Sequence, residues 1–186
     1  MSAGLLTEGG DLIQSEVSGQ NDINEVQNLG EKFLSFLVNG EIYGSDIDRI
    51  KEIIEYGTIT RVPLTPEYLR GVINLRGNVV PVVDLAIRIG KERSPVSKKT
   101  CIIIVEMKCS DGEVVDIGFV VDEVDEVIGI CDDQIISPPQ FGTDIRGDFI
   151  FGMVQLHKKL VILLQLEEVL SVTELAELVE DDDELN

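Results

Sequence analysis

Residues 71–85 read GVINLRGNVVPVVDL, and this stretch predicts a β-rich fold. Two apolar runs flank a short polar turn, Arg76-Gly77-Asn78, which is the pattern of a β-hairpin. Pro81 lies in the second run and cannot donate a ladder hydrogen bond, so we expect that strand at a sheet edge or bulged there. The arginine is unusual, because turns favour Asn, Gly, Pro or Asp.

Further hairpin signals lie on both sides of this stretch. Residues 31–44 are centred on Asn39-Gly40, the strongest short hairpin signal, and residues 100–124 on Asp111-Gly112. Residues 149–166 supply another pair of strand-like runs. The sequence therefore predicts an all-β fold.

Helical signals occur in three short segments. Isoleucines at helical spacing predict a helix over residues 45–54, and residues 65–71 predict a short helical turn. Near the end of the chain Ser171 and Glu174 match a capping box. The apolar stripe that follows is Val172, Leu175, Leu178 and Val179. This combination predicts a C-terminal helix.

The second half of the chain repeats the first. Residues 43–54 (YGSDIDRIKEII) align with residues 117–128 (IGFVVDEVDEVI), 74 positions later, and residues 71–85 align with residues 152–166 (GMVQLHKKLVILLQL), 81 positions later. The order is the same in both halves, which predicts two similar β modules packed together. The second copy builds its turn from His157-Lys158-Lys159, so the hairpin alone does not require Arg76.

The net charge of the 186-residue chain is −20, and both ends are acidic. Residues 1–30 hold five acids and residues 173–186 hold seven, with no Lys or Arg in either. Such a charge repels nucleic acid and anionic lipid and favours a protein partner. No signal peptide or run long enough to span a bilayer is visible, so we expect a cytoplasmic protein.

Catalytic and metal-binding motifs are not visible in the sequence. Cys101, Cys109 and Cys131 lack CxxC spacing and are interpreted as buried reduced thiols, and the single His157 forms no zinc constellation with them. The acids of residues 122–126 alternate with valines, which favours a solvated strand face. We therefore expect no catalytic residue, metal or cofactor. A carboxylate-based enzyme using residues 122–126 stays as the alternative class.

Arg76 has two interpretations. It is either a solvated turn residue or a forked donor to a carboxylate, for which Glu52 at the rim of an apolar stripe is the candidate. Ile50 and Val124 occupy equivalent places in the two halves. They are either core residues or the walls of a groove between the halves that would accept an amphipathic helix.

The combination of NLRG with VPVVDL, preceded by YGSDIDRIKEII and followed by IGFVVDEVDEVI, resembles the CheW family of chemotaxis coupling proteins. The resemblance covers about residues 31–179. It implies two intertwined five-stranded β-barrels of SH3-like topology with short helices and a C-terminal helix. Residues 1–30 are then a disordered acidic tail, and residues 180–186 a second acidic tail.

The resemblance also implies a function, that of an adaptor without catalysis. Members of this family couple the helical cytoplasmic tips of chemoreceptors to the histidine kinase CheA, whose regulatory domain has the same fold. The family's receptor contacts fall here on Ile47, Ile50, Glu52, Arg76, Val124 and Leu34. Its kinase contacts fall on Ile59, Val79 and Phe141. The same module in a different receptor–kinase pathway, such as surface motility, is the alternative within this class.

Overall fold

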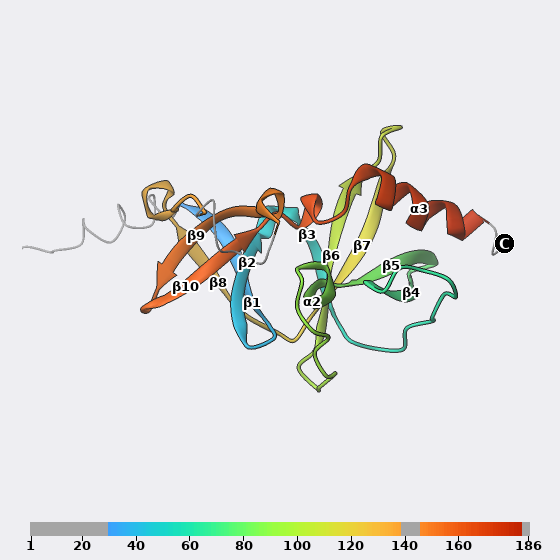
Figure 1. Ribbon diagram of the computed structural model, residues 1–186, viewed down its shortest axis with the longest axis horizontal. Helices are drawn as coiled ribbons and strands as arrows, with labels where there is room; N and C mark the ends of the chain where they lie inside the picture. Colours follow the sequence, from blue (N-terminus) through green and yellow to red (C-terminus); the bar gives the residue numbers. More distant parts are fainter. Residues whose placement is uncertain (1–29, 139–145, 184–186) are drawn as a thin grey trace, which may run out of the picture.

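Two five-stranded sheets form the framework of the protein in a computed structural model that describes residues 30–138 and 146–183 (Figure 1). Barrel 1 has the strand order β8 (Glu123–Ile130), β1 (Glu31–Val38), β2 (Glu41–Asp46), β10 (Lys159–Leu164), β9 (Ile150–Leu156). Barrel 2 has the order β3 (Ile50–Glu55), β6 (Cys101–Lys108), β7 (Val114–Val121), β5 (Asn78–Asp84), β4 (Leu69–Leu75). Short helical elements lie between the strands: η1 (Ile47–Arg49), α2 (Leu85–Arg88), η2 (Asp132–Gln134) and η3 (Gly147–Phe149). A further one, η4 (Leu166–Glu168), follows the last strand, β10.

The chain passes through both barrels in an intertwined order. Barrel 2 is one continuous segment, β3 to β7, whereas barrel 1 joins β1 and β2 to β8, β9 and β10 from the far end of the sequence. Each barrel is closed by one isolated β-bridge between its two edges. In barrel 2, Thr60, after β3, pairs with Val72 of β4, and in barrel 1, Ile136, after β8, pairs with Met153 of β9. The predicted fold, two intertwined SH3-like barrels, is confirmed.

The strand register confirms the internal repeat. Gly44 of β2 lies beside Leu163 of β10 in a parallel pair, and Gly118 of β7 lies beside Val82 of β5 in the same way. The two glycines are 74 residues apart and their partners 81, the offsets of the sequence alignment. A Cβ on Gly44 would lie 2.9 Å from the side chain of Leu163, and one on Gly118 would lie 2.7 Å from that of Ile102. Both barrels are therefore too tightly packed for a side chain at this position.

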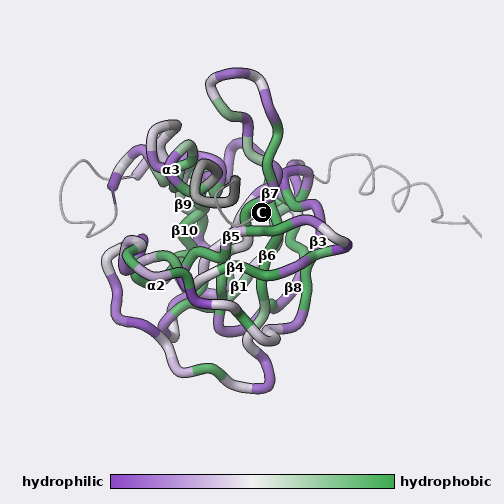
Figure 2. Tube along the Cα trace, turned by 90° about the vertical axis from the view of Figure 1, so that its right-hand side faces the viewer, coloured by the Kyte–Doolittle hydropathy of each residue, from purple (hydrophilic) through white to green (hydrophobic). Residues whose placement is uncertain are grey.

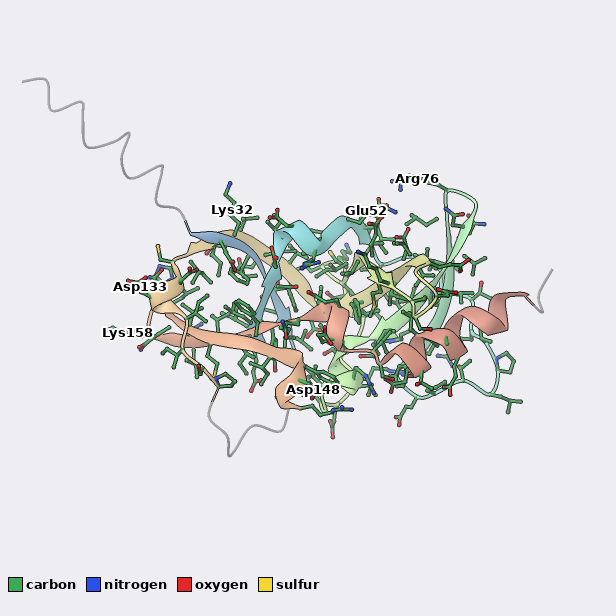
Figure 3. The ribbon with its side chains drawn as sticks, turned by 90° about the horizontal axis from the view of Figure 1, so that it is seen from above. Lys32, Glu52, Arg76, Asp133, Asp148 and Lys158 are labelled. Carbon is green, nitrogen blue, oxygen red and sulfur yellow. The ribbon has the colours of Figure 1, made fainter. Side chains whose placement is uncertain are left out.

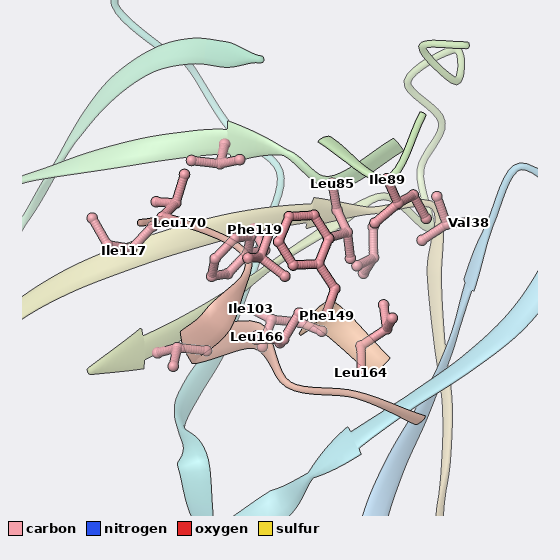
Figure 4. Packing of buried hydrophobic residues seen from close by; sticks show 14 of the residues in the cluster. Val38, Leu85, Ile89, Ile103, Ile117, Phe119, Phe149, Leu164, Leu166 and Leu170 are labelled. Carbon is pink, nitrogen blue, oxygen red and sulfur yellow. The ribbon is translucent and has the colours of Figure 1, made fainter. Parts of the chain in front are cut away.

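Buried side chains form three clusters, one inside each barrel and a larger one between them. Figure 4 shows part of the larger cluster, the shared core. Strand β6 contributes to two of these clusters: Ile102 and Ile104 point into barrel 2, and Ile103 and Val105 point into the shared core. Successive strand residues face opposite sides, so a strand buried on both faces needs an unbroken apolar run. This requirement explains the sequence CIIIV at residues 101–105.

The predicted C-terminal helix is confirmed as α3 (Val172–Asp183), with the Ser171 hydroxyl accepting from the Glu174 amide at 3.2 Å and the Glu174 carboxylate accepting from the Ser171 amide at 2.8 Å. Leu175 and Leu178 are buried. The helix reaches four residues beyond the predicted end of the domain. None of the helices in the two described segments is long and apolar enough to cross a membrane.

Three local predictions were wrong. Residues 45–54 form the turn η1 and the edge strand β3 rather than a helix, and residues 65–71 form a turn that leads into β4. Strand β5, which carries Pro81, lies between β7 and β4 instead of at an edge, and the register shift of the β4–β5 pair falls on β4, between Leu69 and Gly71, instead of at Pro81. Pro81 is tolerated because the parallel ladder to β7 begins only at Val82. Most of the predicted N-terminal tail, residues 1–29, lies outside the described residues.

Candidate functional site

Arg76 occupies a backbone conformation that arginine rarely adopts. It forms the two-residue turn between β4 and β5 with Gly77, and φ is +53° at Arg76 and +86° at Gly77. Two positive φ angles define the hairpin turn that most often carries Asn-Gly. The Asn74 side chain stabilises it by accepting a hydrogen bond of 3.0 Å from the Gly77 amide. Conformational preference therefore does not select arginine at this position.

The Arg76 guanidinium makes a two-pronged ion pair with Glu52 (Figure 3). Its Nη1 lies 2.6 Å from Oε1 and its Nη2 lies 2.8 Å from Oε2. Glu52 belongs to β3 and Arg76 follows β4, the two strands at opposite ends of the sheet order, so the pair bridges the two edges of barrel 2. The hydrogen bonds from Arg76 lower the pKa of Glu52, and those to Glu52 raise the pKa of Arg76. The predicted proximity of these two residues is confirmed.

The neighbouring residue Lys51 is held on the other face of β3. Its ammonium lies 3.0 Å from Asp116 of β7 and 3.0 Å from Glu106 of β6, and its hydrogen bonds to Asp116 and Glu106 raise its pKa. Two consecutive residues of the edge strand β3 therefore form ion pairs with different parts of barrel 2: Lys51 with β6 and β7, and Glu52 with the β4–β5 turn. This arrangement keeps the Glu52 carboxylate in position without a neighbouring strand on its outer side.

Apolar side chains line β3 and its counterpart β8. Both are edge strands, and they lie on the same side of the molecule (Figure 2). Ile50 and Val124, at equivalent positions, are half-buried against the shared core. Ile53 and Val127, another equivalent pair, are 41% and 49% exposed. We define the edge-strand surface as these four residues together with Ile47, Glu52 and Arg76. Ile53 and Val127 were not predicted as site residues, although they are paired by the internal repeat.

Leu34 does not belong to this surface. It is 4% exposed and packs in the shared core, where the register places it opposite Val127. A side chain so buried has no area to offer a partner, so its assignment as a receptor contact is corrected. Ile47, at the start of η1, is half-buried.

The structure describes two of the three predicted kinase contacts, Ile59 and Val79. Ile59 is half-buried against the core of barrel 2, the cluster that contains Val80. Val79 is 42% exposed and, because strand residues alternate, it faces away from that core. Phe141 lies outside the described residues.

Asp122, in the turn before β8, and Glu123, the first residue of β8, make structural contacts. Asp122 accepts from the Asn39 amide at 2.7 Å and from the Ser94 hydroxyl at 3.0 Å, and Glu123 lies 2.9 Å from the Lys99 ammonium. Within residues 30–138 and 146–183, no cluster of His, Cys, Asp and Glu is arranged to hold a metal ion. Burial raises the pKa of the Cys101 and Cys109 thiols, which disfavours the reactive thiolate.

Comparison with known proteins places this geometry in a family. The family model of the CheW-like domain matches residues 32–174. The chemotaxis protein CheW of Klebsiella aerogenes is 33% identical over 150 residues, which cover 81% of this chain and 87% of that protein. The protein FrzA of Myxococcus xanthus is 27% identical over 127 residues, covering 67% of this chain and 74% of FrzA.

A solved structure agrees with these relatives. The crystal structure of the scaffolding protein TtCheW from Thermoanaerobacter tengcongensis superimposes with a TM-score of 0.69 at 36% identity, covering 78% of this chain and 90% of that one. The residues that match the family model, 32–174, contain both barrels and the start of α3. The chain belongs to the CheW-like domain family.

Proposed function

We propose that this protein is a non-catalytic adaptor that couples the helical cytoplasmic tip of a chemoreceptor to the regulatory domain of the CheA histidine kinase. Membership of the CheW-like domain family supports the proposal, and so do the names of its relatives, a chemotaxis protein and a scaffolding protein. The proposal implies a cytoplasmic protein whose partners are other proteins.

The Glu52–Arg76 pair is the observation that carries the receptor half of the proposal. The pair is held at the edge of barrel 2, and the side chain of Arg76 is 70% exposed while that of Glu52 is 21% exposed. An arginine in an unfavourable backbone conformation, fixed by two hydrogen bonds and still open to solvent, is suited to contact a partner. Lysine has no planar fork and cannot reproduce this geometry.

The apolar members of the edge-strand surface would supply the rest of the contact. A receptor helix crossing β3 and β8 would cover Ile53 and Val127, each with more than a third of its surface exposed. An amphipathic helix presents its apolar residues along one face, which suits two parallel rows of aliphatic side chains with a charged pair beside them.

Binding measurements on single variants test the receptor half. Arg76→Ala and Arg76→Lys should each weaken binding of a receptor-tip helical hairpin by roughly ten-fold, because Glu52 loses its fixed partner. Binding to the isolated CheA regulatory domain should stay unchanged. Isothermal titration calorimetry with each partner separately gives both affinities, and circular dichroism shows whether the fold is intact.

A matched control lies in the equivalent hairpin of barrel 1. Lys158 follows β9 in a turn with φ of +66°, and Lys158→Ala should leave both affinities at the wild-type value. The proposal fails if Arg76→Ala binds the receptor tip as tightly as the wild type. It also fails if the variant loses both partners together through unfolding.

The similarity to FrzA supports a second candidate function, which is the same adaptor role in another receptor–kinase pathway. That relative carries a name other than CheW and matches two thirds of the chain. Titration with receptor tips from two different pathways of the source cell would separate the candidates, because the better partner binds more tightly at the same edge-strand surface.

A further inference from the structure

The chain crosses from barrel 2 to barrel 1 through a single residue. Strand β7 of barrel 2 ends at Val121 and strand β8 of barrel 1 begins at Glu123, so Asp122 alone joins them. The crossover in the other direction, from β2 to β3, has the three-residue turn η1 instead. The backbone angles of Asp122 therefore set the direction in which β8 leaves barrel 2, and such a position acts as a hinge.

Hydrogen bonds to three segments hold Asp122 in place. Its amide donates one of 2.9 Å to the Leu37 carbonyl of β1. Its carboxylate oxygen Oδ2 accepts one of 2.7 Å from the Asn39 amide, in the β1–β2 turn, and one of 3.0 Å from the Ser94 hydroxyl. Ser94 lies in the loop between α2 and β6, which points to the same side of the molecule as the β1–β2 turn (Figure 1). Hydrogen bonds to an ionised carboxylate are stronger than neutral ones, so these contacts are suited to fix the crossover.

The start of this loop is attached to barrel 2. We call residues 91–94 (Lys-Glu-Arg-Ser) the interbarrel strap. The Lys91 amide donates a hydrogen bond of 2.8 Å to the Ala86 carbonyl of α2. Arg93 donates through Nε to the buried carboxylate of Asp84, the last residue of β5, at 3.0 Å. The strap is therefore fixed to barrel 2 at a buried charge.

The same four residues are also attached to barrel 1. The Glu92 carbonyl accepts a hydrogen bond of 2.8 Å from the Asn39 side chain, and the Lys91 ammonium lies 2.8 Å from the Glu41 carboxylate. The bond from Ser94 to the crossover residue adds a third contact. None of the four residues has an apolar side chain that could join a core. The strap therefore links the barrels without adding to their apolar packing.

The strap supplies a directional restraint between the barrels. Apolar packing in the shared core is largely non-directional, so it resists separation of the barrels more than rotation of one against the other. Hydrogen bonds are directional, and those of the strap join the β1–β2 turn, the crossover residue and the buried end of β5. The strap therefore restricts the angle between the two barrels.

This angle decides the shape of the edge-strand surface. Strand β3, with Glu52 and Ile53, belongs to barrel 2, whereas strand β8, with Val127, belongs to barrel 1 and starts directly after Asp122. A helix that lies across both strands meets all its contacts only at one separation of the two strands. We propose that Ser94 is a positioning residue that, through Asp122, holds β8 at the distance from β3 that a receptor helix requires, an inference that rests on the receptor contact proposed above.

Substitutions of Ser94 test the inference without changing a residue of the binding surface. Ser94→Ala removes the hydroxyl, and Ser94→Asp places a second negative charge beside the Asp122 carboxylate. Both lower the fraction of molecules with the competent barrel angle, and the apparent receptor affinity should fall by the same factor, about three-fold in Ser94→Ala and at least about ten-fold in Ser94→Asp. Ser94→Thr keeps the hydroxyl and should bind a receptor-tip helical hairpin within about two-fold of the wild type.

Residual dipolar couplings of backbone amides give a readout that a purely stabilising role would not change. In the wild-type chain the couplings of both barrels should fit one alignment tensor. In Ser94→Asp each barrel should need its own tensor, because the barrels then move against each other. Calorimetric titrations give the receptor affinity and, separately, the affinity for the kinase regulatory domain. The latter should stay at the wild-type value, since the two described kinase contacts predicted above, Ile59 and Val79, lie in barrel 2 alone.

A matched control lies in the same loop. The Ser97 hydroxyl accepts a hydrogen bond of 3.1 Å from the Lys99 amide, a contact within the loop. Ser97→Ala should therefore change neither the couplings nor the affinities. Circular dichroism checks the fold of each variant, and if Ser94→Asp does not fold, Ser94→Ala gives the same readouts with smaller changes.

The outcomes separate this inference from the receptor contact itself. One tensor for both barrels in Ser94→Asp overturns the inference, and so does wild-type receptor affinity in that variant while Arg76→Ala binds weakly. A lower melting temperature with unchanged receptor affinity also overturns it, because the strap then only stabilises the fold. A wild-type chain that does not bind the receptor tip overturns the receptor half of the adaptor function and the role of Ser94 in binding, whereas two tensors in Ser94→Asp would still show that the strap sets the barrel angle.

Discussion

The hairpins β4–β5 and β9–β10 share one geometry and differ in chemistry. Leu75 pairs with Asn78 in the first and Leu156 with Lys159 in the second, and each turn holds two residues with positive φ. The first turn reaches across the barrel to Glu52. The equivalent acid and turn residue of barrel 1 are Glu126 and His157, and the described part of the structure contains no ion pair between them. The hairpin fold therefore requires the two-residue turn, whereas the ion pair across the barrel is an addition in barrel 2.

A second difference between the barrels lies at the end of the same hairpin. Asp84 closes β5, and its buried carboxylate accepts from Arg70 Nε at 2.7 Å and Arg93 Nε at 3.0 Å, whereas Gln165 stands at the equivalent place after β10. Asp84→Ala should lower the free energy of unfolding by about 3–5 kcal/mol, because it leaves the largely buried Arg70 unpaired. Urea denaturation followed by circular dichroism measures this loss.

The matched change in barrel 1 is Gln165→Ala, for which we expect a loss below about 1 kcal/mol. Equal losses in the two variants would show that the arginine network adds nothing to barrel 2. A small loss for Asp84→Ala alone would mean that solvent reaches Arg70 and replaces the carboxylate.

Helix α3 is a third difference between the barrels. It follows β10, the last strand of barrel 1, but packs against barrel 2. Leu178 lines a cleft with Val79 and Val114, and Leu175 is 1% exposed in the shared core. Leu175→Ala should lower the free energy of unfolding by about 2–5 kcal/mol, as expected for a fully buried leucine. Chemical denaturation gives the value, with the exposed Glu177→Ala as the control. A loss below about half a kcal/mol would place the helix in solvent.

The smallest expected effect concerns the titration of Glu52. The pKa of this carboxyl is lowered by its hydrogen bonds to Arg76, so the pair stabilises the fold above the pKa of the unfolded chain. The stabilisation is lost as the pH falls through the lowered pKa of the folded state. In Arg76→Ala the pKa of Glu52 should rise towards its usual value, and in Lys158→Ala it should not move. Carboxyl-carbon NMR titration measures both, and an unmoved pKa in Arg76→Ala would contradict the ion pair.

Local chemistry made several features predictable from the sequence. Asn39-Gly40 and Asp111-Gly112 mark real hairpins because their residues tolerate the turn, and Ser171 with Glu174 marks a real helix start because their side chains satisfy free amides. The repeated glycines were informative because neither barrel has room for a side chain there. Glu52 and Arg76 were correctly brought together, 24 positions apart in the sequence.

Features set by tertiary packing were not predictable. The isoleucines of residues 45–54 have helical spacing although most of them lie in a strand. Their side chains have different environments, because Ile50 packs on the shared core, Ile54 packs on the core of barrel 2, and Ile53 faces solvent. Leu34 was assigned to the surface although it lies in a core that only the second half of the chain completes. The positive φ of Leu64 leaves no signal in a leucine.

The division of barrel 1 between distant segments has a consequence for its biogenesis. As the chain emerges from the ribosome, β3 to β7 can assemble as soon as residue 121 is free, because every strand of barrel 2 is then present. Strands β1 and β2 are made first, yet their neighbours β8 and β10 follow about 80 to 120 residues later. Until then the hairpin of residues 31–46 keeps both edges open, and such edges invite pairing with other nascent chains. The hairpin of β1 and β2 is thus synthesised before barrel 2 but completes its strand pairing after it. The nascent chain therefore passes through a stage in which all strands of barrel 2 are present and barrel 1 is incomplete.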